Sequence, residues 1–233
     1  MRRSKFFIIF SVLTYNLMAQ RVLLSEVPGE KYFNNKYGPN YKHYIHGYMH
    51  SGFYVEDGNK NNVEINNLKS YRLGLGCRYK LKINKYFSTG LDLSSNINVY
   101  NIKQDKMKVY PDRREHEVQK LILYNIGLSP YFRINFGRRG NKVGKYVDLG
   151  FDNFYSYIEM NLYKDKPNNN TIVKEKETRL NYINNFNFGP CCRFAMDQFI
   201  LFFSYRLNDM FRMDKNSLSM TRYEVGMEIG FYN

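Results

Sequence analysis

One stretch of the chain alternates between two kinds of side chain, and this alternation limits the possible folds more than any other feature. From Ser70 to Ile83 the sequence reads SYRLGLGCRYKLKI. Successive side chains of an extended chain point to opposite faces, so the large apolar residues fall on one face and the arginines, lysines and glycines on the other. A helix would scatter both sets around its axis. The pattern predicts a β-strand with one apolar face and one basic face.

Further segments of this type follow along the chain. Residues 87–99 set apolar side chains against Ser, Gly, Asp and Asn, and residues 223–231 set them against Glu and Gly. Two segments are mixed, because apolar residues stand where polar ones are expected. These are Leu121 and Leu123 in one segment and Ile200 and Phe202 in the other. The predicted extended segments are roughly 43–56, 68–83, 87–101, 117–136, 145–163, 179–195, 198–209 and 219–232.

The connections between these segments alternate in length. NKY and MDQ are tight, whereas IKQDKMKVYPDRREHE and KDKPNNNTIVKEKE are long. Bacterial outer-membrane barrels have short periplasmic turns, long outer loops, an even strand count and both chain ends in the periplasm. A soluble sandwich has no reason to alternate so regularly. The sequence therefore predicts an all-β fold, a transmembrane antiparallel up-and-down β-barrel of eight strands, in the bacterial outer membrane with both termini periplasmic.

The glycines decide which face meets lipid. A secreted lipid-binding calyx with an apolar interior would alternate in the same way. A face turned toward water is expected to carry larger solubilising groups, whereas glycine inside a narrow barrel leaves volume for Arg and Lys. The 22 Tyr and 18 Phe also supply interfacial girdles. We therefore expect lipid outside and a small polar lumen within. The glycines of the inner face are Gly74, Gly76, Gly90, Gly226 and Gly230.

The N-terminus has the features of a secretory signal. A basic start precedes an apolar run over residues 6–13, and the small residue Ala19 marks a cleavage site before Gln20. A retained anchor would need an apolar run of roughly 20 residues. The predicted domains are a signal peptide over 1–19, an irregular lead-in over 20–42 and the outer-membrane β-barrel over 43–233.

Charge narrows the choice of partners. The formal net charge is +14, but export argues against nucleic acid and favours outer-membrane lipid and the phosphates of lipopolysaccharide. Three cysteines, an odd number, make a disulfide framework improbable. Basic residues of the outer loops are candidates for binding lipopolysaccharide or an acidic partner, and simple solvation is the alternative. This outer-loop basic patch consists of Lys103, Lys106, Lys108, Arg113, Arg114, Lys174 and Lys176.

A tight turn sets the register of one strand pair. A three-residue loop over 84–86 places Ile83 opposite Phe87, and this places Arg78 opposite Asp92 on the inner face. An eight-stranded interior is just wide enough for side chains, and an unpaired charge there is costly. We therefore expect a hydrogen-bonded plug and no continuous pore. The predicted lumen polar network is Arg72, Arg78, Asp92, Arg133, Arg193, Glu224 and Glu228.

No sequence motif indicates catalysis. A Gly-x-Ser-x-Gly elbow, a His-Glu-x-x-His motif and a phosphate loop are all missing from the sequence. On a strand, His46 and His50 lie about 13 Å apart, too far for one metal ion. His116 stands among acidic residues, which favours a solvated charge cluster over a metal or acid–base site. We expect no catalytic residue, cofactor or metal. A lipid A-modifying enzyme stays open as an alternative, because such barrels assemble their sites only through the fold.

Several stretches resemble a known family. These are a signal ending in MAQ, the middle segment QKLILYNIGLSPYFRINFGRRGNKVGKYVDLGFDNFY, the hairpin GPCCRFAMDQFILFFSYRLNDMF and the terminal SMTRYEVGMEIGFYN. Together they are similar to PorT-like outer-membrane β-barrel proteins of Bacteroidota, over most of residues 44–233. The resemblance implies an outer-membrane location and, for some members of the family, a part in protein secretion or surface assembly. We therefore expect a non-enzymatic protein, either structural or a subunit of an outer-membrane secretion or assembly complex, that acts through its outer loops or periplasmic rim. A small-solute channel is the alternative.

Overall fold

The computed structural model describes most of one compact unit of the chain. The unit covers residues 35–233. The predicted signal peptide, its cleavage site at Ala19 and Gln20, and the lead-in up to residue 37 lie outside the described residues. The described residues are 38–56, 63–104, 108, 110, 114–137, 140, 142–168, 171–212 and 220–232.

Within the described residues, nine strands make up a single antiparallel sheet, so the all-β prediction is confirmed. In the described part of the chain, no helix has the length and apolar character needed to cross a membrane. The elements are β1 (His43–Val55), a 3-10 turn η1 (Asn67–Lys69), β2 (Tyr71–Lys82), β3 (Phe87–Ile102), β4 (Val118–Phe136), β5 (Lys145–Asn168), β6 (Thr171–Thr178), β7 (Phe186–Met196), β8 (Phe199–Tyr205) and β9 (Tyr223–Phe231).

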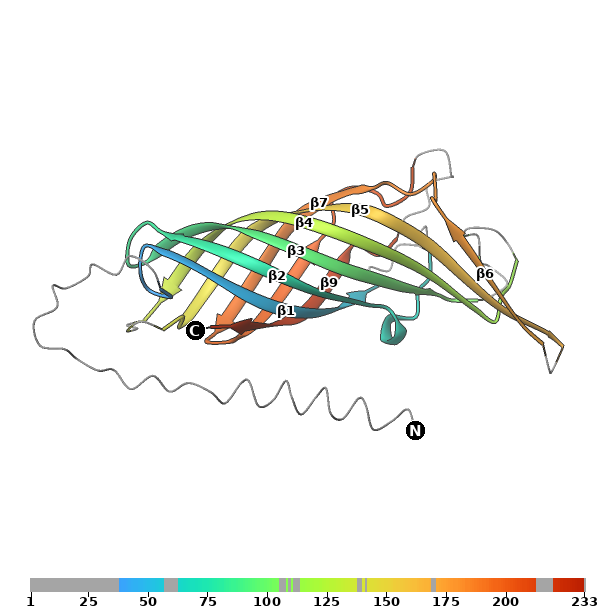
Figure 1. The fold of residues 1–233 in the computed structure, drawn as a ribbon, viewed down its shortest axis with the longest axis horizontal. Coiled ribbons are helices and arrows are strands. Elements are labelled where there is room, and N and C mark those ends of the chain that lie inside the picture. Colours follow the sequence, from blue (N-terminus) through green and yellow to red (C-terminus); the bar gives the residue numbers. More distant parts are fainter. Residues whose placement is uncertain are drawn as a thin grey trace, which may run out of the picture. The chain divides into compact units, whose positions relative to one another are not determined.

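Eight of these strands close into a ring. The sheet order is β4-β3-β2-β1-β9-β8-β7-β5-β6, and β4 also pairs with β5. Among the described strands, β6 has β5 as its one neighbour, and Figure 1 shows these two strands extending beyond the others. Apart from β6, neighbours in the ring are neighbours along the chain, and β1 pairs with β9. The long connections therefore gather at one end of the ring, and the short turns at the other.

One strand differs from the sequence prediction. Residues 171–178, which we expected to be loop, form β6 and pair with residues 160–168 of β5. The sixth predicted segment begins at Phe186 instead of residue 179. The stretch KEKE inside β6 alternates two charges and has no apolar face, so the period-two signal is missing there. Pairing with β5 supplies the extended structure instead.

The predicted register between β2 and β3 is confirmed. The backbone N–H of Ile83 donates to the carbonyl of Phe87 over 3.0 Å, and the turn between them has three residues. Arg78 consequently lies opposite Asp92. The two faces are also as expected, since Leu75 is 61% exposed whereas Arg78 is completely buried.

Interior glycines make room for large neighbours. A Cβ atom added at Gly76 would lie 2.2 Å from the Tyr48 ring. One added at Gly90 would lie 2.0 Å from the backbone oxygen of Tyr79 and 2.5 Å from the Tyr131 hydroxyl. These contacts are far shorter than van der Waals separation. The inner glycines therefore accommodate aromatic side chains within a narrow space.

Two apolar clusters fill the ends of the ring. The first joins residues of all four long connections to Leu121 and Leu123, and the second, near the short turns, includes Ile200. These side chains interrupt polar faces in the sequence because the interior itself changes from apolar to charged and back along the strands. The first cluster is Tyr54, Val63, Ile65, Tyr100, Ile102, Tyr110, Leu121, Leu123, Leu180, Ile183, Met210, Phe211 and Met220; the second is Tyr44, Val143, Tyr146, Ala195 and Ile200.

Candidate functional site

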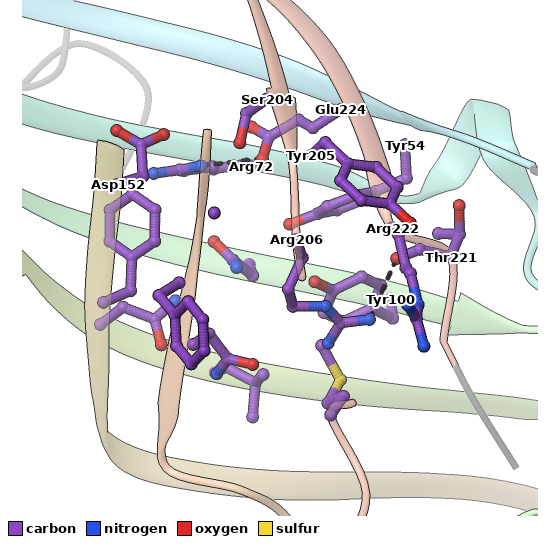
Figure 2. A pocket seen from close by; sticks show the side chains of 18 residues that line it. Tyr54, Arg72, Tyr100, Asp152, Ser204, Tyr205, Arg206, Thr221, Arg222 and Glu224 are labelled. Carbon is purple, nitrogen blue, oxygen red and sulfur yellow. Dashed lines mark hydrogen bonds and ion pairs between the residues drawn. The ribbon is translucent and has the colours of Figure 1, made fainter. Parts of the chain in front are cut away.

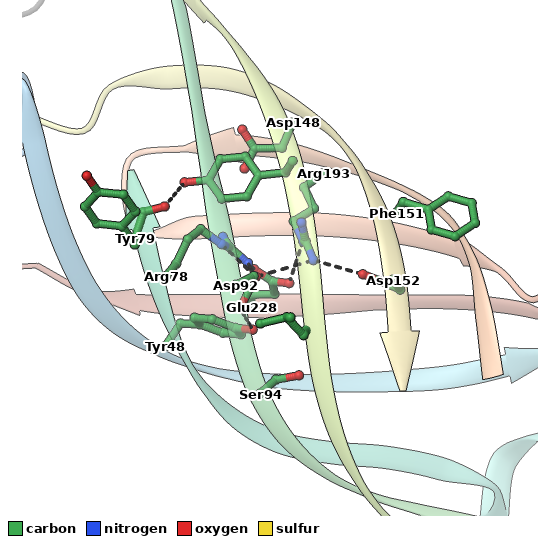
Figure 3. A network of polar contacts seen from close by, with 12 residues as sticks. Tyr48, Arg78, Tyr79, Asp92, Ser94, Asp148, Phe151, Asp152, Arg193 and Glu228 are labelled. Carbon is green, nitrogen blue, oxygen red and sulfur yellow. Dashed lines mark hydrogen bonds and ion pairs between the residues drawn. The ribbon is translucent and has the colours of Figure 1, made fainter. Parts of the chain in front are cut away.

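Between the two apolar clusters, the interior of the ring holds a small cavity (Figure 2) and a layer of ion pairs (Figure 3). Arg78 lies at the centre of the layer. Its Nε and Nη2 atoms donate to Oδ2 of Asp92 over 2.9 and 2.7 Å, and Nη2 also donates to Oε2 of Glu228 over 2.8 Å. The guanidinium lies over the Tyr48 ring, 4.4 Å from its centroid. One arginine thus joins β2 to β3 and β9.

A second arginine extends this layer to β5 and β7. Arg193 Nε donates to Oε1 of Glu228 over 3.2 Å. Its Nη2 atom is 3.4 Å from Oδ2 of Asp92 and 3.4 Å from Oδ1 of Asp152. Figure 3 shows Arg193 and Arg78 converging on the same carboxylates. Because charges buried without partners are costly, shared carboxylates stabilise both guanidiniums.

Two further pairs lie on either side of this centre. Arg72 donates to Glu224 over 2.8 Å, and Arg133 donates to both carboxylate oxygens of Asp148 over 2.6 and 2.8 Å. The Arg72 guanidinium lies 4.2 Å from the centroid of the Phe154 ring. Salt bridges and ring contacts therefore hold the planes of these guanidiniums in place.

The structure brings all seven residues of the predicted network into the interior, together with two carboxylates that sequence reasoning missed. These are Asp148 and Asp152 of β5, both buried. Asp148 lies opposite Arg133 in the β4–β5 register. Both positions belong to the polar face of the predicted segment 145–163. The signal was present, but it needed the β4–β5 register, which no tight turn fixes.

The cavity of Figure 2 lies next to the first apolar cluster, with Tyr54, Tyr100, Leu123 and Met210 among its lining residues. Its volume is about 50 Å³, enough for a few water molecules. Its lining carries buried polar atoms without a protein partner: Nε of Arg72, Oε1 of Glu224 and Nη1 of Arg206. Donors and acceptors occur together, which suits water or a small polar molecule better than a single ion.

A second cavity of about 20 Å³ adjoins the first, and Arg72, Asp152 and Phe154 line both. The Arg72 side chain, which pairs with Glu224 and lies over the Phe154 ring, thus contributes to the lining of both cavities. At the short-turn end, Lys80 donates to the carbonyl oxygen of Pro39. Buried ion pairs and the two apolar clusters thus occupy much of the described interior, and two small polar cavities lie among them.

The strand histidines face this interior. His46 is 4% and His50 is 6% exposed, and the His46 ring packs against Tyr44 and Tyr232. Within the described ranges, no three His, Cys, Asp or Glu side chains gather closely enough to hold a metal ion.

His116 differs from the sequence expectation of a solvated charge cluster. It is only 7% exposed, and its Nδ1 atom lies 2.9 Å from Oδ2 of Asp165, while its ring packs 4.7 Å from the Tyr163 ring. The part of β5 that extends toward β6 brings both partners to the histidine. The hydrogen bond with His116 holds the pKa of the Asp165 carboxyl below its usual value. Glu117 beside it pairs with Lys166 at 2.8 Å, which lowers the pKa of Glu117 in the same way.

The predicted outer-loop basic patch is divided among different surroundings. Lys108 is buried, where it donates to Oε1 of Gln104 and to the carbonyl of Arg114. Lys103 pairs with Glu64 at 3.2 Å. Lys174 and Lys176 lie exposed on β6, and Lys106 and Arg113 lie outside the described residues. Lys108 is therefore not available to an external ligand in this arrangement.

No model of a known protein family matches this chain, and no curated protein matches it either.

Proposed function

We propose that this chain is a non-enzymatic β-barrel protein of the bacterial outer membrane. One observation carries the proposal: the ring is apolar outside and charged inside. Neighbouring strands expose large apolar side chains on the outer face, among them Leu75, Leu93, Leu128, Leu149 and Leu201. Soluble monomers rarely expose so continuous an apolar surface. In hydrocarbon the same surface is stable, and each of the eight strands of the ring pairs on both sides, as a membrane-spanning sheet requires.

The orientation follows from the connections. Short turns face the periplasm in such barrels, and long loops face outward. The long connections of this chain meet at the first apolar cluster, and β5 and β6 extend from the same end. We therefore place this end outside the cell, with both termini periplasmic.

The filled interior supports action through surfaces instead of through a pore. Among the described residues, arginine–carboxylate pairs and two apolar clusters occupy the interior, and the two cavities that lie beside them measure about 50 and 20 Å³. We therefore favour a structural protein, or an accessory subunit of an outer-membrane secretion or assembly complex. Its partners are outer-membrane lipid, lipopolysaccharide and protein subunits. The resemblance to PorT-like proteins of Bacteroidota agrees with this role.

Fractionation tests the location. The protein should be recovered with outer membranes, resist carbonate extraction and migrate differently in gels before and after boiling. Recovery as a soluble monomer without detergent would contradict the proposal. Affinity purification in mild detergent then tests the role, because a monomer with no stoichiometric partner would contradict membership of a complex.

A further inference from the structure

A surface groove lies where β5 changes its partner strand. Strand β7 pairs with β5 only up to Tyr155, and β6 pairs with it only from Met160 onward. The connection over residues 179–185 crosses this gap. Beside it is a groove of about 470 Å³, lined by Tyr157, Ile158, Glu159, Arg179 and Arg212 among others.

The connection that follows β6 and the one that follows β8 form the groove, and backbone hydrogen bonds join them. Ile183 and Phe211 form an antiparallel bridge, and the backbone N–H of Arg212 donates to the carbonyl of Tyr182 over 2.9 Å. Leu180 and Ile183 are both buried in the first apolar cluster. The backbone at Arg179 and Arg212 is therefore held against the first apolar cluster, although both arginine side chains are exposed.

Two guanidiniums from different connections line this groove. Arg179 has a φ of 62°, a region that non-glycine residues seldom adopt. Arg212 Nη2 donates to Oδ1 of Asn185 over 3.2 Å. Within the part of the chain that the structure describes, neither arginine forms an ion pair at 4 Å or less. Backbone strain of this kind is often retained at functional sites.

One carboxylate, Glu159, shares the groove and interacts electrostatically with Arg212 as well as with Asn185. Glu159 is 7% exposed and its Oε1 atom accepts from Nδ2 of Asn185 over 2.6 Å. The groove therefore carries two guanidiniums and one carboxylate, and its net charge is positive. Guanidiniums of this kind match the geometry of phosphate and bind it through paired N–H donors.

The rim of the groove on β5 is apolar. Tyr157 is 53% and Ile158 is 43% exposed, and they follow the outward-facing Tyr155 at the long-connection end of the apolar surface. A free anion would use only the arginines. A lipid with a phosphorylated headgroup would use both the arginines and the apolar rim.

We propose that this groove binds the phosphate group of a membrane lipid, an inference that rests on the proposed membrane location. Arg179 and Arg212 contact the phosphate, and Tyr157 packs against the apolar part of the same lipid. A phosphate monoester is the preferred headgroup, because it carries the most charge.

The test uses the protein in nanodiscs of phosphatidylcholine containing a minor fraction of phosphatidic acid. Native mass spectrometry counts the phosphatidic acid molecules that stay bound after release. The double variant Arg179→Gln/Arg212→Gln should bind about tenfold less phosphatidic acid, since charge-assisted hydrogen bonds are lost. The control Lys69→Gln/Lys120→Gln removes two positive charges at the same end of the ring, outside the groove and outside the outer-loop basic patch, and should bind as the unmodified protein does.

A further variant protects the test against misfolding. Arg179→Gly relieves the unusual φ while it removes one guanidinium, so it should fold at least as well and still bind less phosphatidic acid. Equal loss in the lysine control, or unchanged binding in the arginine variants, would overturn the proposal. Binding of inorganic phosphate as tight as that of phosphatidic acid would overturn the assignment to lipid.

The two proposals fail in different ways. A protein that does not enter nanodiscs and does not change its gel mobility on boiling contradicts the membrane location. A protein that inserts, but whose arginine variants still retain phosphatidic acid, contradicts the groove alone.

Discussion

Arg78 and Asp92 lie directly opposite each other on β2 and β3, and Nη2 of Arg78 is 2.7 Å from Oδ2 of Asp92. Both side chains are almost completely buried. Replacing Arg78 with leucine would leave Asp92 and Glu228 with fewer positive partners. We expect Arg78→Leu to lower the free energy of unfolding by about 3–5 kcal/mol, the range for breaking a buried ion pair.

Urea unfolding in detergent micelles, followed by gel mobility, would measure this cost. Lys103→Leu is the control, because the Lys103–Glu64 pair is about half exposed and should contribute less than about 1 kcal/mol. Equal effects of the two substitutions would show that the interior layer is not a buried network.

Glycine at position 90 should resist replacement. A Cβ there would lie 2.0 Å from a backbone oxygen of the neighbouring strand, which cannot move without shifting the strand. We expect Gly90→Ala to cost about 1–3 kcal/mol, as overpacking does. At Gly47 the nearest atom would be 3.6 Å away, so Gly47→Ala should change the unfolding free energy little. The same urea assay compares the two, and equal stability would contradict the close approach at Gly90.

Thiol reactivity should distinguish the two faces. Cys77 is exposed on the outer face and Cys191 is buried inside the ring. In variants that keep one cysteine each and are reconstituted in vesicles, a lipid-soluble maleimide should label Cys77, whereas a charged reagent should label it slowly. Cys191 should react with neither until the protein unfolds. Rapid labelling of Cys77 by the charged reagent in vesicles would contradict contact with lipid.

The hydrogen bond between His116 and Asp165 predicts a dependence on pH. The pKa of Asp165 is lowered in the folded protein, so the stabilisation from this contact is present above the ordinary carboxyl pKa of about 3.9. It is lost as the pH falls through the lower folded value. His116→Leu should raise the pKa of Asp165 toward the ordinary value, as measured by NMR of the side-chain carboxyl carbon in micelles.

Lys166→Gln is the matched control, because Lys166 pairs with Glu117 instead. It should raise the pKa of Glu117 and leave that of Asp165 in place. An unchanged Asp165 pKa in the His116 variant would mean that the contact contributes nothing in solution.

The ion pairs and apolar side chains inside the ring predict that the protein does not conduct ions. Arginine–carboxylate pairs and the apolar clusters cross the described interior, and the cavities beside them measure about 50 and 20 Å³. We expect no steady conductance when the purified protein is added to planar bilayers, with a porin as the positive control. Stable single-channel steps would favour the small-solute channel over the structural role.

Local sequence pattern was sufficient wherever a strand has two distinct faces and a tight turn. The register that joins Arg78 to Asp92 follows from the three residues after Ile83 and the period of two. The same reasoning could not find β6, because its lysines and glutamates have no apolar side to detect. It also treated Leu121 as an irregularity, since the change from charged to apolar interior depends on connections that fold over the ring end.

Contacts between distant segments were the least accessible from sequence. His116 stands among acidic residues, but its partner Asp165 lies 2.9 Å away only because β5 extends past the ring. Arg179 and Arg212 come together through the bridge between Ile183 and Phe211. No periodic pattern in the sequence indicates either contact, because each depends on how segments outside the ring pack against each other.

Strand β1 pairs with β9, so the ring closes only once β9 has been made and has paired. Loop-closure entropy makes such distant pairing slow, and until it forms β1 and β8 each present an open row of backbone donors and acceptors. Strand β9 therefore covers both of these open edges when it pairs with β1 and β8. A chain that stops before residue 223 would keep both edges open and would be prone to join other chains edge to edge.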